Sequence, residues 1–93
     1  MDQMIINGRG YSVACNWRAC VNFLQQRGTD SLSALSELTK LAPSDLALLC
    51  WCCVAEGERL EGREIDIAPD FIEGLSMLDA FNVIGDFIRI YNE

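Results

Sequence analysis

The chain has 93 residues, of which 51% are hydrophobic, and its formal net charge is −7. A chain of this length forms one domain, here residues 1–93, with no room for a second core. The negative charge disfavours nucleic acid and anionic membranes as partners, because both would repel it. The longest apolar run is only half of what a membrane span needs, and the first residues lack the basic segment of a secretory signal.

The charge is unevenly distributed along the chain. Residues 1–55 hold four acidic and four basic residues, whereas residues 56–93 hold ten acidic and three basic ones, so the whole excess of −7 lies in the second segment. A basic segment of another protein is the partner that such a surface favours.

Residues 1–14 are predicted to form a β-hairpin. Asn7-Gly8 is the strongest short signal for a type I′ turn, which needs a positive φ at both central residues. A two-stranded hairpin is marginal alone and has to pack on helices or pair with another chain. Its first strand, which contains Ile5 and Ile6, is therefore a candidate protein-binding edge.

Residues 15–55 are predicted to be helical. Asn16 is a suitable N-cap for a helix that ends at about Arg27, before Gly28. Its expected core stripe has helical spacing and consists of Trp17, Cys20, Val21 and Leu24, and Phe23 widens it. A second, short helix is expected to begin near Asp30 or Ser31, with leucines at positions 32, 35 and 38.

A third helix opens at Pro43-Ser44-Asp45, where proline is tolerated and an acid is favourable. From Leu46 to Ala55 every residue is apolar, which predicts a buried central helix. One side of this helix, which includes Trp51, is a candidate contact for a protein partner.

Residues 56–66 are predicted to be a solvated charged connector, because they combine acids, arginines and two glycines. Residues 67–93 are expected to hold two acidic C-terminal helices, one from Pro69 and one from about Leu78 to Tyr91. In the last helix an apolar stripe is expected to pack inward (Leu78, Phe81, Ile84, Ile88 and Tyr91). A spare apolar arc, formed by Val83, Phe87 and Ile90, is expected to bind protein. The predicted fold is thus mainly α, a bundle of four to five helices with an N-terminal β-hairpin.

The chain has no histidine, which removes Ser-His and Cys-His nucleophile pairs and histidine metal sites. Three of its five cysteines, Cys50, Cys52 and Cys53, lie inside the apolar run and lack the spacing of a zinc site. Buried cysteine behaves as a small hydrophobic residue. We therefore expect reduced thiols, no metal, no cofactor and no enzymatic activity.

Asp30-Ser31-Leu32 matches the triplet at which acyl carrier proteins carry phosphopantetheine on the serine. This match supports an alternative function, an acyl-carrier-like protein modified at Ser31. A simpler interpretation is that Asp30 or Ser31 caps a helix.

The order of elements resembles that of the small tail assembly chaperones of long-tailed bacteriophages and prophages. The resemblance rests on the opening Ile5-Ile6-Asn7-Gly8 with Tyr11, on the leucine-rich helix from Pro43, and on the charged exit Ala55–Gly62 with its acidic helical end. It implies a cytoplasmic protein of a bacterial host cell, without catalytic residues, that coats the hydrophobic tape-measure protein and hands it to the tail-tube protein.

The predicted function is therefore non-enzymatic protein binding, with a tape-measure-like helical segment as the client and with self-association into homo-oligomers. A further alternative is a regulatory interaction protein without a ligand. The predicted binding residues are Val83, Phe87, Ile90, Trp51, Ile5 and Ile6.

Overall fold

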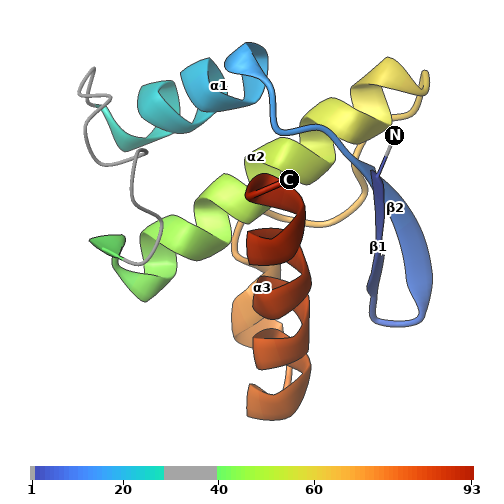
Figure 1. Cartoon of the computed structure of the whole chain (residues 1–93), viewed down its shortest axis with the longest axis vertical. Helices are drawn as coiled ribbons and strands as arrows, with labels where there is room; N and C mark the ends of the chain where they lie inside the picture. Colours follow the sequence, from blue (N-terminus) through green and yellow to red (C-terminus); the bar gives the residue numbers. More distant parts are fainter. Residues whose placement is uncertain (1, 29–39) are drawn as a thin grey trace.

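The computed structural model describes residues 2–28 and 40–93, and it is mainly helical with an N-terminal β-hairpin, as predicted. Helix α2 crosses the middle of the molecule, α1 lies along one side of it, and the hairpin and α3 pack against the rest (Figure 1). The described part holds three α-helices and one 3₁₀-helix, fewer than the expected four to five helices. The short helix that was expected from Asp30 or Ser31 lies outside the described residues. The elements are β1 (Asp2–Ile6), β2 (Arg9–Val13), α1 (Trp17–Arg27), α2 (Pro43–Leu60), η3 (Phe71–Gly74) and α3 (Met77–Tyr91).

The hairpin forms at the predicted turn. Asn7 and Gly8 have φ values of 57° and 83°, as a type I′ turn requires. The antiparallel register pairs Met4 with Tyr11. Because side chains alternate along a strand, Met4 and Ile6 are buried while Ile5 between them is 62% exposed. The hairpin thus contributes one face to the core.

Helix α1 begins and ends where predicted. The Asn16 side chain accepts a hydrogen bond from the Ala19 N–H, and Gly28 ends the helix in the left-handed region at φ 70°. The predicted core stripe is right in part: Phe23 is buried, and Cys20 and Leu24 are partly buried against the core. It is wrong at Trp17, which is 68% exposed, and it missed the buried Ala19. Helix α1 packs on α2, and the face of α1 that carries Ala19 and Phe23 is the buried one.

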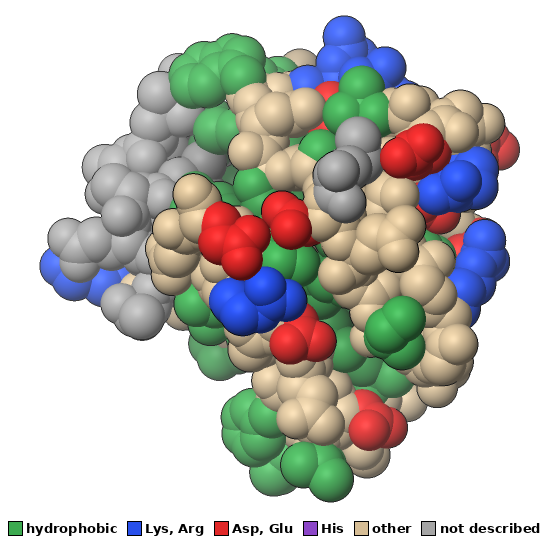
Figure 2. All heavy atoms as spheres, turned by 45° about the vertical axis from the view of Figure 1, so that its right-hand side comes forward, with side chains coloured by type: hydrophobic (Ala, Val, Ile, Leu, Met, Phe, Trp, Pro, Cys, Tyr) green, Lys and Arg blue, Asp and Glu red, His purple; other side chains and the backbone are tan. Residues whose placement is uncertain are grey.

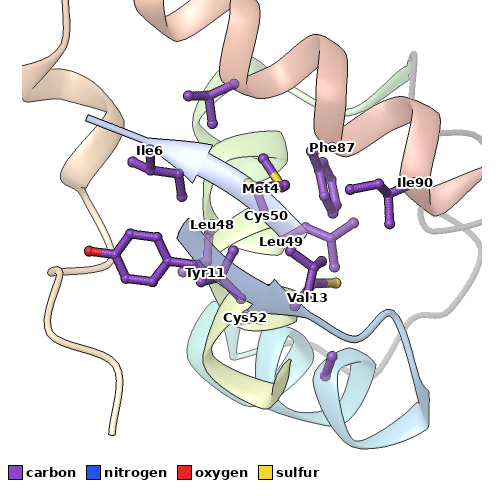
Figure 3. Packing of buried hydrophobic residues seen from close by; sticks show 14 of the residues in the cluster. Met4, Ile6, Tyr11, Val13, Leu48, Leu49, Cys50, Cys52, Phe87 and Ile90 are labelled. Atoms are coloured by element: carbon purple, nitrogen blue, oxygen red, sulfur yellow. The ribbon is translucent and has the colours of Figure 1, made fainter. Parts of the chain in front are cut away.

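Helix α2 is the buried central helix that the apolar run predicts. Cys50, Cys52, Cys53 and Val54 are at most 1% exposed. The helix is apolar all round because α1, β2 and α3 contact it on different sides. Figure 3 shows side chains from the hairpin, α2 and α3 meeting in one cluster. The labelled members are Met4, Ile6, Tyr11, Val13, Leu48, Leu49, Cys50, Cys52, Phe87 and Ile90.

The charged connector does not begin at residue 56, because α2 continues to Leu60. Glu56 and Glu58 are only 5% and 1% exposed, so the expectation of solvated carboxylates is wrong for both. Gly57 lies against β2: a Cβ atom there would be 2.2 Å from the Ser12 carbonyl oxygen. The absence of a side chain at Gly57 is what lets the helix cross the strand at this distance.

The expected helix from Pro69 is reduced to one turn of 3₁₀-helix, η3. Leu75 is extended and ends this turn, and the next residue, Ser76, already caps α3. Three partly buried residues of this segment pack against the core: Phe71, Ile72 and Leu75.

Candidate protein-binding surface

Helix α3 carries three of the six large apolar side chains that are exposed in the described part of the chain. Its start is set locally: the Ser76 hydroxyl accepts a hydrogen bond from the Asp79 N–H at 3.1 Å, and Asp79 supplies a negative charge to the first turn. The helix then runs to Tyr91 with more apolar residues than one packing face needs. Which part of this wide arc is covered decides where a partner can bind.

The covered part is the arc that was expected to be free. Val83, Phe87 and Ile90 are 5%, 0% and 6% exposed. Figure 3 shows Phe87 and Ile90 beside Met4 of β1, so the hairpin covers this arc. The prediction that these three side chains form an exposed binding arc is therefore wrong.

The uncovered part of the apolar arc lies on the first turns of α3. Met77, Leu78 and Phe81 are 76%, 69% and 68% exposed. Figure 2 shows hydrophobic side chains gathered at the lower tip of the molecule, where Figure 1 places the start of α3. The half-buried Ile84 and Ile88 continue the stripe toward the C-terminus. We call this surface the α3 seam (Met77, Leu78, Phe81, Ile84 and Ile88).

The spacing within the α3 seam is that of a helix-binding surface. Met77, Phe81, Ile84 and Ile88 follow one another at intervals of four, three and four residues. This is the spacing of the a and d positions that pack helix against helix in a coiled coil. The structure adds that Met77 and Phe81 are exposed, whereas Ile84 and Ile88 are partly buried against the core.

The surroundings of the α3 seam are acidic. Asp79 and Asp86 are exposed on α3, and Asp70 and Glu73 lie on the turn that precedes it. The one basic residue of α3, Arg89, pairs with Glu93 at 3.1 Å. A partner with basic residues beside its apolar face would meet opposite charges here.

The other predicted binding residues are distributed differently. Ile5 is exposed on the hairpin, whereas Ile6 is buried in the core. Trp51 is half-buried, and its indole N–H donates to the Ile67 carbonyl oxygen at 2.7 Å. Residues near Ile67 thus cover the side of α2 that was expected to face a partner. Ser31 lies outside the described residues.

A second exposed aromatic residue lies at the other end of the molecule. Trp17 flanks an open groove of about 570 Å³ between α1 and the end of α2. Arg59 and Glu56 also line this groove, and they form an ion pair with each other at 2.7 Å. The groove is thus more polar than the α3 seam, and it provides a matched comparison for binding tests.

The two buried carboxylates are held by hydrogen bonds to arginine and to neighbouring polar groups. Glu58 accepts hydrogen bonds from Arg63 at 2.8 Å and from the backbone N–H of Ser12 at 3.1 Å. Glu56 accepts one from the Asn16 side chain at 2.8 Å, in addition to its pair with Arg59. The hydrogen bonds from Arg63 and Arg59 hold the pKa of Glu58 and Glu56 below their usual values, against the effect of burial. These acids tie α2 to β2 and to the start of α1, which is a structural role.

This arrangement predicts that Glu58 contributes to the free energy of unfolding and that this contribution depends on pH. Because its folded pKa is lowered, the contribution is present above the unfolded pKa of about 4.3 and is lost as the pH falls through the folded pKa. At pH 7 we expect Glu58→Gln to lower the free energy of unfolding by about 2 kcal/mol, less than for a fully buried pair because Arg63 is half exposed.

Urea unfolding of both proteins from pH 7 to pH 3 tests this expectation. The difference between wild type and Glu58→Gln should shrink below about pH 4.3. The exposed Glu64 is the control: Glu64→Gln should change stability at pH 7 by less than about 0.5 kcal/mol. A difference for Glu58→Gln that persists unchanged to pH 3 would contradict the proposed ion pair.

The remaining chemistry-bearing side chains do not form a metal centre in the described structure. No group of three or more Cys, Asp or Glu side chains among residues 2–28 and 40–93 is placed to hold a metal ion. All five cysteines are free thiols, three of them buried in α2. Likewise, no helix in the described part of the chain is long and apolar enough to cross a membrane.

The prediction that Leu78 and Phe81 pack inward is wrong, because they are 69% and 68% exposed. The same prediction is right in part for Ile84 and Ile88, which are partly buried against the core. No role was predicted for Met77 from the sequence. Comparisons of the chain with protein-family models, with curated proteins and with solved structures gave no match. The α3 seam and its acidic surroundings are therefore the observations on which a function can be built.

Proposed function

We propose that this protein binds an apolar helical segment of another protein through the α3 seam, in the manner of a bacteriophage tail assembly chaperone. The observation that carries this proposal is the exposure of Met77, Leu78 and Phe81, which are each more than two-thirds exposed on one helix. Large apolar side chains gathered on one surface mark an interaction site.

The shape of the surface favours a helix as the ligand. The α3 seam is straight and presents its side chains at the spacing of coiled-coil a and d positions. A partner helix with the same spacing would place its own apolar residues between them, as in helix-in-groove recognition. An extended strand has a repeat of two residues and does not match this spacing.

The charge around the α3 seam favours a basic helix. Four exposed acids lie on α3 and the preceding turn: Asp70, Glu73, Asp79 and Asp86. Lysine or arginine residues beside the apolar face of the client would speed association and fix its orientation. A long hydrophobic helical protein, such as the tape-measure protein implied by the resemblance, is the client that we propose. The tail-tube protein is the proposed recipient.

The first test uses a defined probe, a synthetic peptide of about three heptads with Leu at positions a and d and Lys beside them. Wild-type protein is expected to bind it. Phe81→Asp should weaken binding by at least about 30-fold, because a charge would be buried at the centre of the contact. Fluorescence anisotropy of the labelled peptide measures the Kd of each protein.

Trp17→Asp is the matched control, since Trp17 is also 68% exposed but lies on α1. This variant should bind the peptide as wild type does. A peptide with Glu in place of Lys should bind more weakly, because the acidic surroundings would repel it. Loss of binding in Trp17→Asp, with Phe81→Asp unaffected, would move the site to the groove beside α1.

The chaperone part of the proposal is tested by co-expression with a bacteriophage tape-measure protein. Wild type should keep the client in a soluble complex, and Phe81→Asp should not. Without a client, we propose that copies of the chain associate through the α3 seam at micromolar concentration. Light scattering should then find Phe81→Asp monomeric and Trp17→Asp unchanged. Peptide binding without tape-measure binding would remove the chaperone assignment and leave a helix-binding protein.

A further inference from the structure

Two cysteines far apart in sequence meet where the segment after β2 crosses α2. The Ala14 N–H donates a hydrogen bond to the Cys53 carbonyl oxygen at 3.0 Å, which brings Cys15 onto the helix. Cys15 is exposed, whereas Cys53 is 1% exposed, and both residues line the same small pocket. This contact is separate from the α3 seam.

The two thiols line a small pocket that an oxidant can enter. It has a volume of about 100 Å³, and Cys20 is a third thiol on its wall. A water molecule occupies roughly 30 Å³ in the liquid, so the pocket has room for a molecule of the size of hydrogen peroxide. Asn16, Leu49 and Tyr91 complete the lining.

The environment distinguishes Cys15 from the other thiols. The hydrogen bond from Cys53 lowers the pKa of Cys15, although burial and Asp2 oppose this effect. Burial raises the pKa of Cys20, Cys50 and Cys52, the last to about 12. The thiolate is the reactive form of cysteine, so exposure and thiolate character coincide at Cys15.

We propose that Cys15 and Cys53 form a peroxide-reactive dithiol site. The Cys15 thiolate attacks one oxygen of a hydroperoxide, the O–O bond breaks, and Cys15 becomes a sulfenic acid while hydroxide or alkoxide leaves. The Cys53 sulfur then attacks the Cys15 sulfur and displaces the hydroxyl group. The thiol proton of Cys53 leaves with it as water, so two thiols are oxidised to a disulfide while one peroxide is reduced.

The disulfide would connect the β2–α1 segment to the middle of α2. Cys53 is the expected partner because the hydrogen bond between Ala14 and Cys53 holds the chain next to Cys15 against α2, whereas Cys20 lies on α1. A second thiol beside the reactive one also protects it from further oxidation.

The test treats the full-length reduced protein with stoichiometric hydrogen peroxide and measures its intact mass. Disulfide formation removes two hydrogens, a loss of about 2 Da. Trypsin then releases Cys15 within residues 10–18 and Cys53 within residues 41–59. Tandem mass spectrometry of the linked peptides should place the bond at Cys53 rather than at Cys50 or Cys52.

Variants make the assignment specific. Cys15→Ser should abolish the mass loss, and it should fold because Cys15 is exposed. Cys20→Ser is the matched control and should still form the disulfide. A bond between Cys15 and Cys20, a product carrying only sulfinic or sulfonic acid at Cys15, or no reaction at Cys15 would each overturn the proposal.

Discussion

Replacing Gly57 by alanine is expected to destabilise the folded protein severely. The added Cβ atom would lie 2.2 Å from the Ser12 carbonyl oxygen and 2.5 Å from the Val13 nitrogen, and both are backbone atoms of β2. Neither can move away without separating the strand from α2. The loss should exceed about 4 kcal/mol, a large part of the roughly 5–10 kcal/mol that stabilises a domain of this size.

Gly85 provides the matched control, because it also lies inside a helix but has no atom within 4 Å of a built Cβ. Gly85→Ala should stabilise the protein by up to about 1 kcal/mol, since alanine is the better helix former. Circular dichroism and urea unfolding of the two variants measure both effects. A folded Gly57→Ala protein with wild-type stability would mean that α2 and β2 do not cross at this distance.

Truncation of Phe87 to alanine is expected to produce the second largest loss. Its ring is fully buried, and it makes an edge-to-face contact with Tyr91 at 5.8 Å between ring centroids. Removing a buried phenylalanine costs about 3–5 kcal/mol, because apolar burial is lost and a cavity remains. The midpoint of urea unfolding should fall accordingly.

Phe81 on the same helix is the control, since it is 68% exposed. Phe81→Ala should change the free energy of unfolding by less than about 0.5 kcal/mol, although it should weaken peptide binding. The two variants together test which face of α3 is inside. Equal losses at both positions, or a larger loss at Phe81, would contradict the orientation of α3 in this structure.

The amino-acid sequence by itself determined the elements whose causes are local. Asn7-Gly8 specified the hairpin turn, and Asn16 and Gly28 specified the ends of α1. The apolar run from Leu46 to Ala55 specified the buried central helix. Each of these depends on a few neighbouring residues, through a turn that needs positive φ, a side-chain cap or an unbroken apolar surface.

Part of the candidate site was also predictable. The sequence showed that the last helix has a wider apolar arc than one packing face requires, and that its surroundings are acidic. It did not show which part of the arc is covered. Two apolar stripes of similar size are equivalent until a neighbour packs on one of them, and that neighbour is the hairpin, some 80 residues earlier in the chain.

Only the tertiary structure decided the remaining features, because each depends on a contact between distant segments. The burial of Glu56 and Glu58 depends on Asn16 and on Ser12 with Arg63, and without such partners these acids would be solvated. The position of Cys15 beside the pocket that Cys53 also lines depends on where the segment after β2 crosses α2. Tertiary packing likewise buried Val83, Phe87 and Ile90, because this side of α3 packs on the hairpin. It left Met77, Leu78 and Phe81 exposed, because nothing in the described chain covers the other side of the first turns of α3.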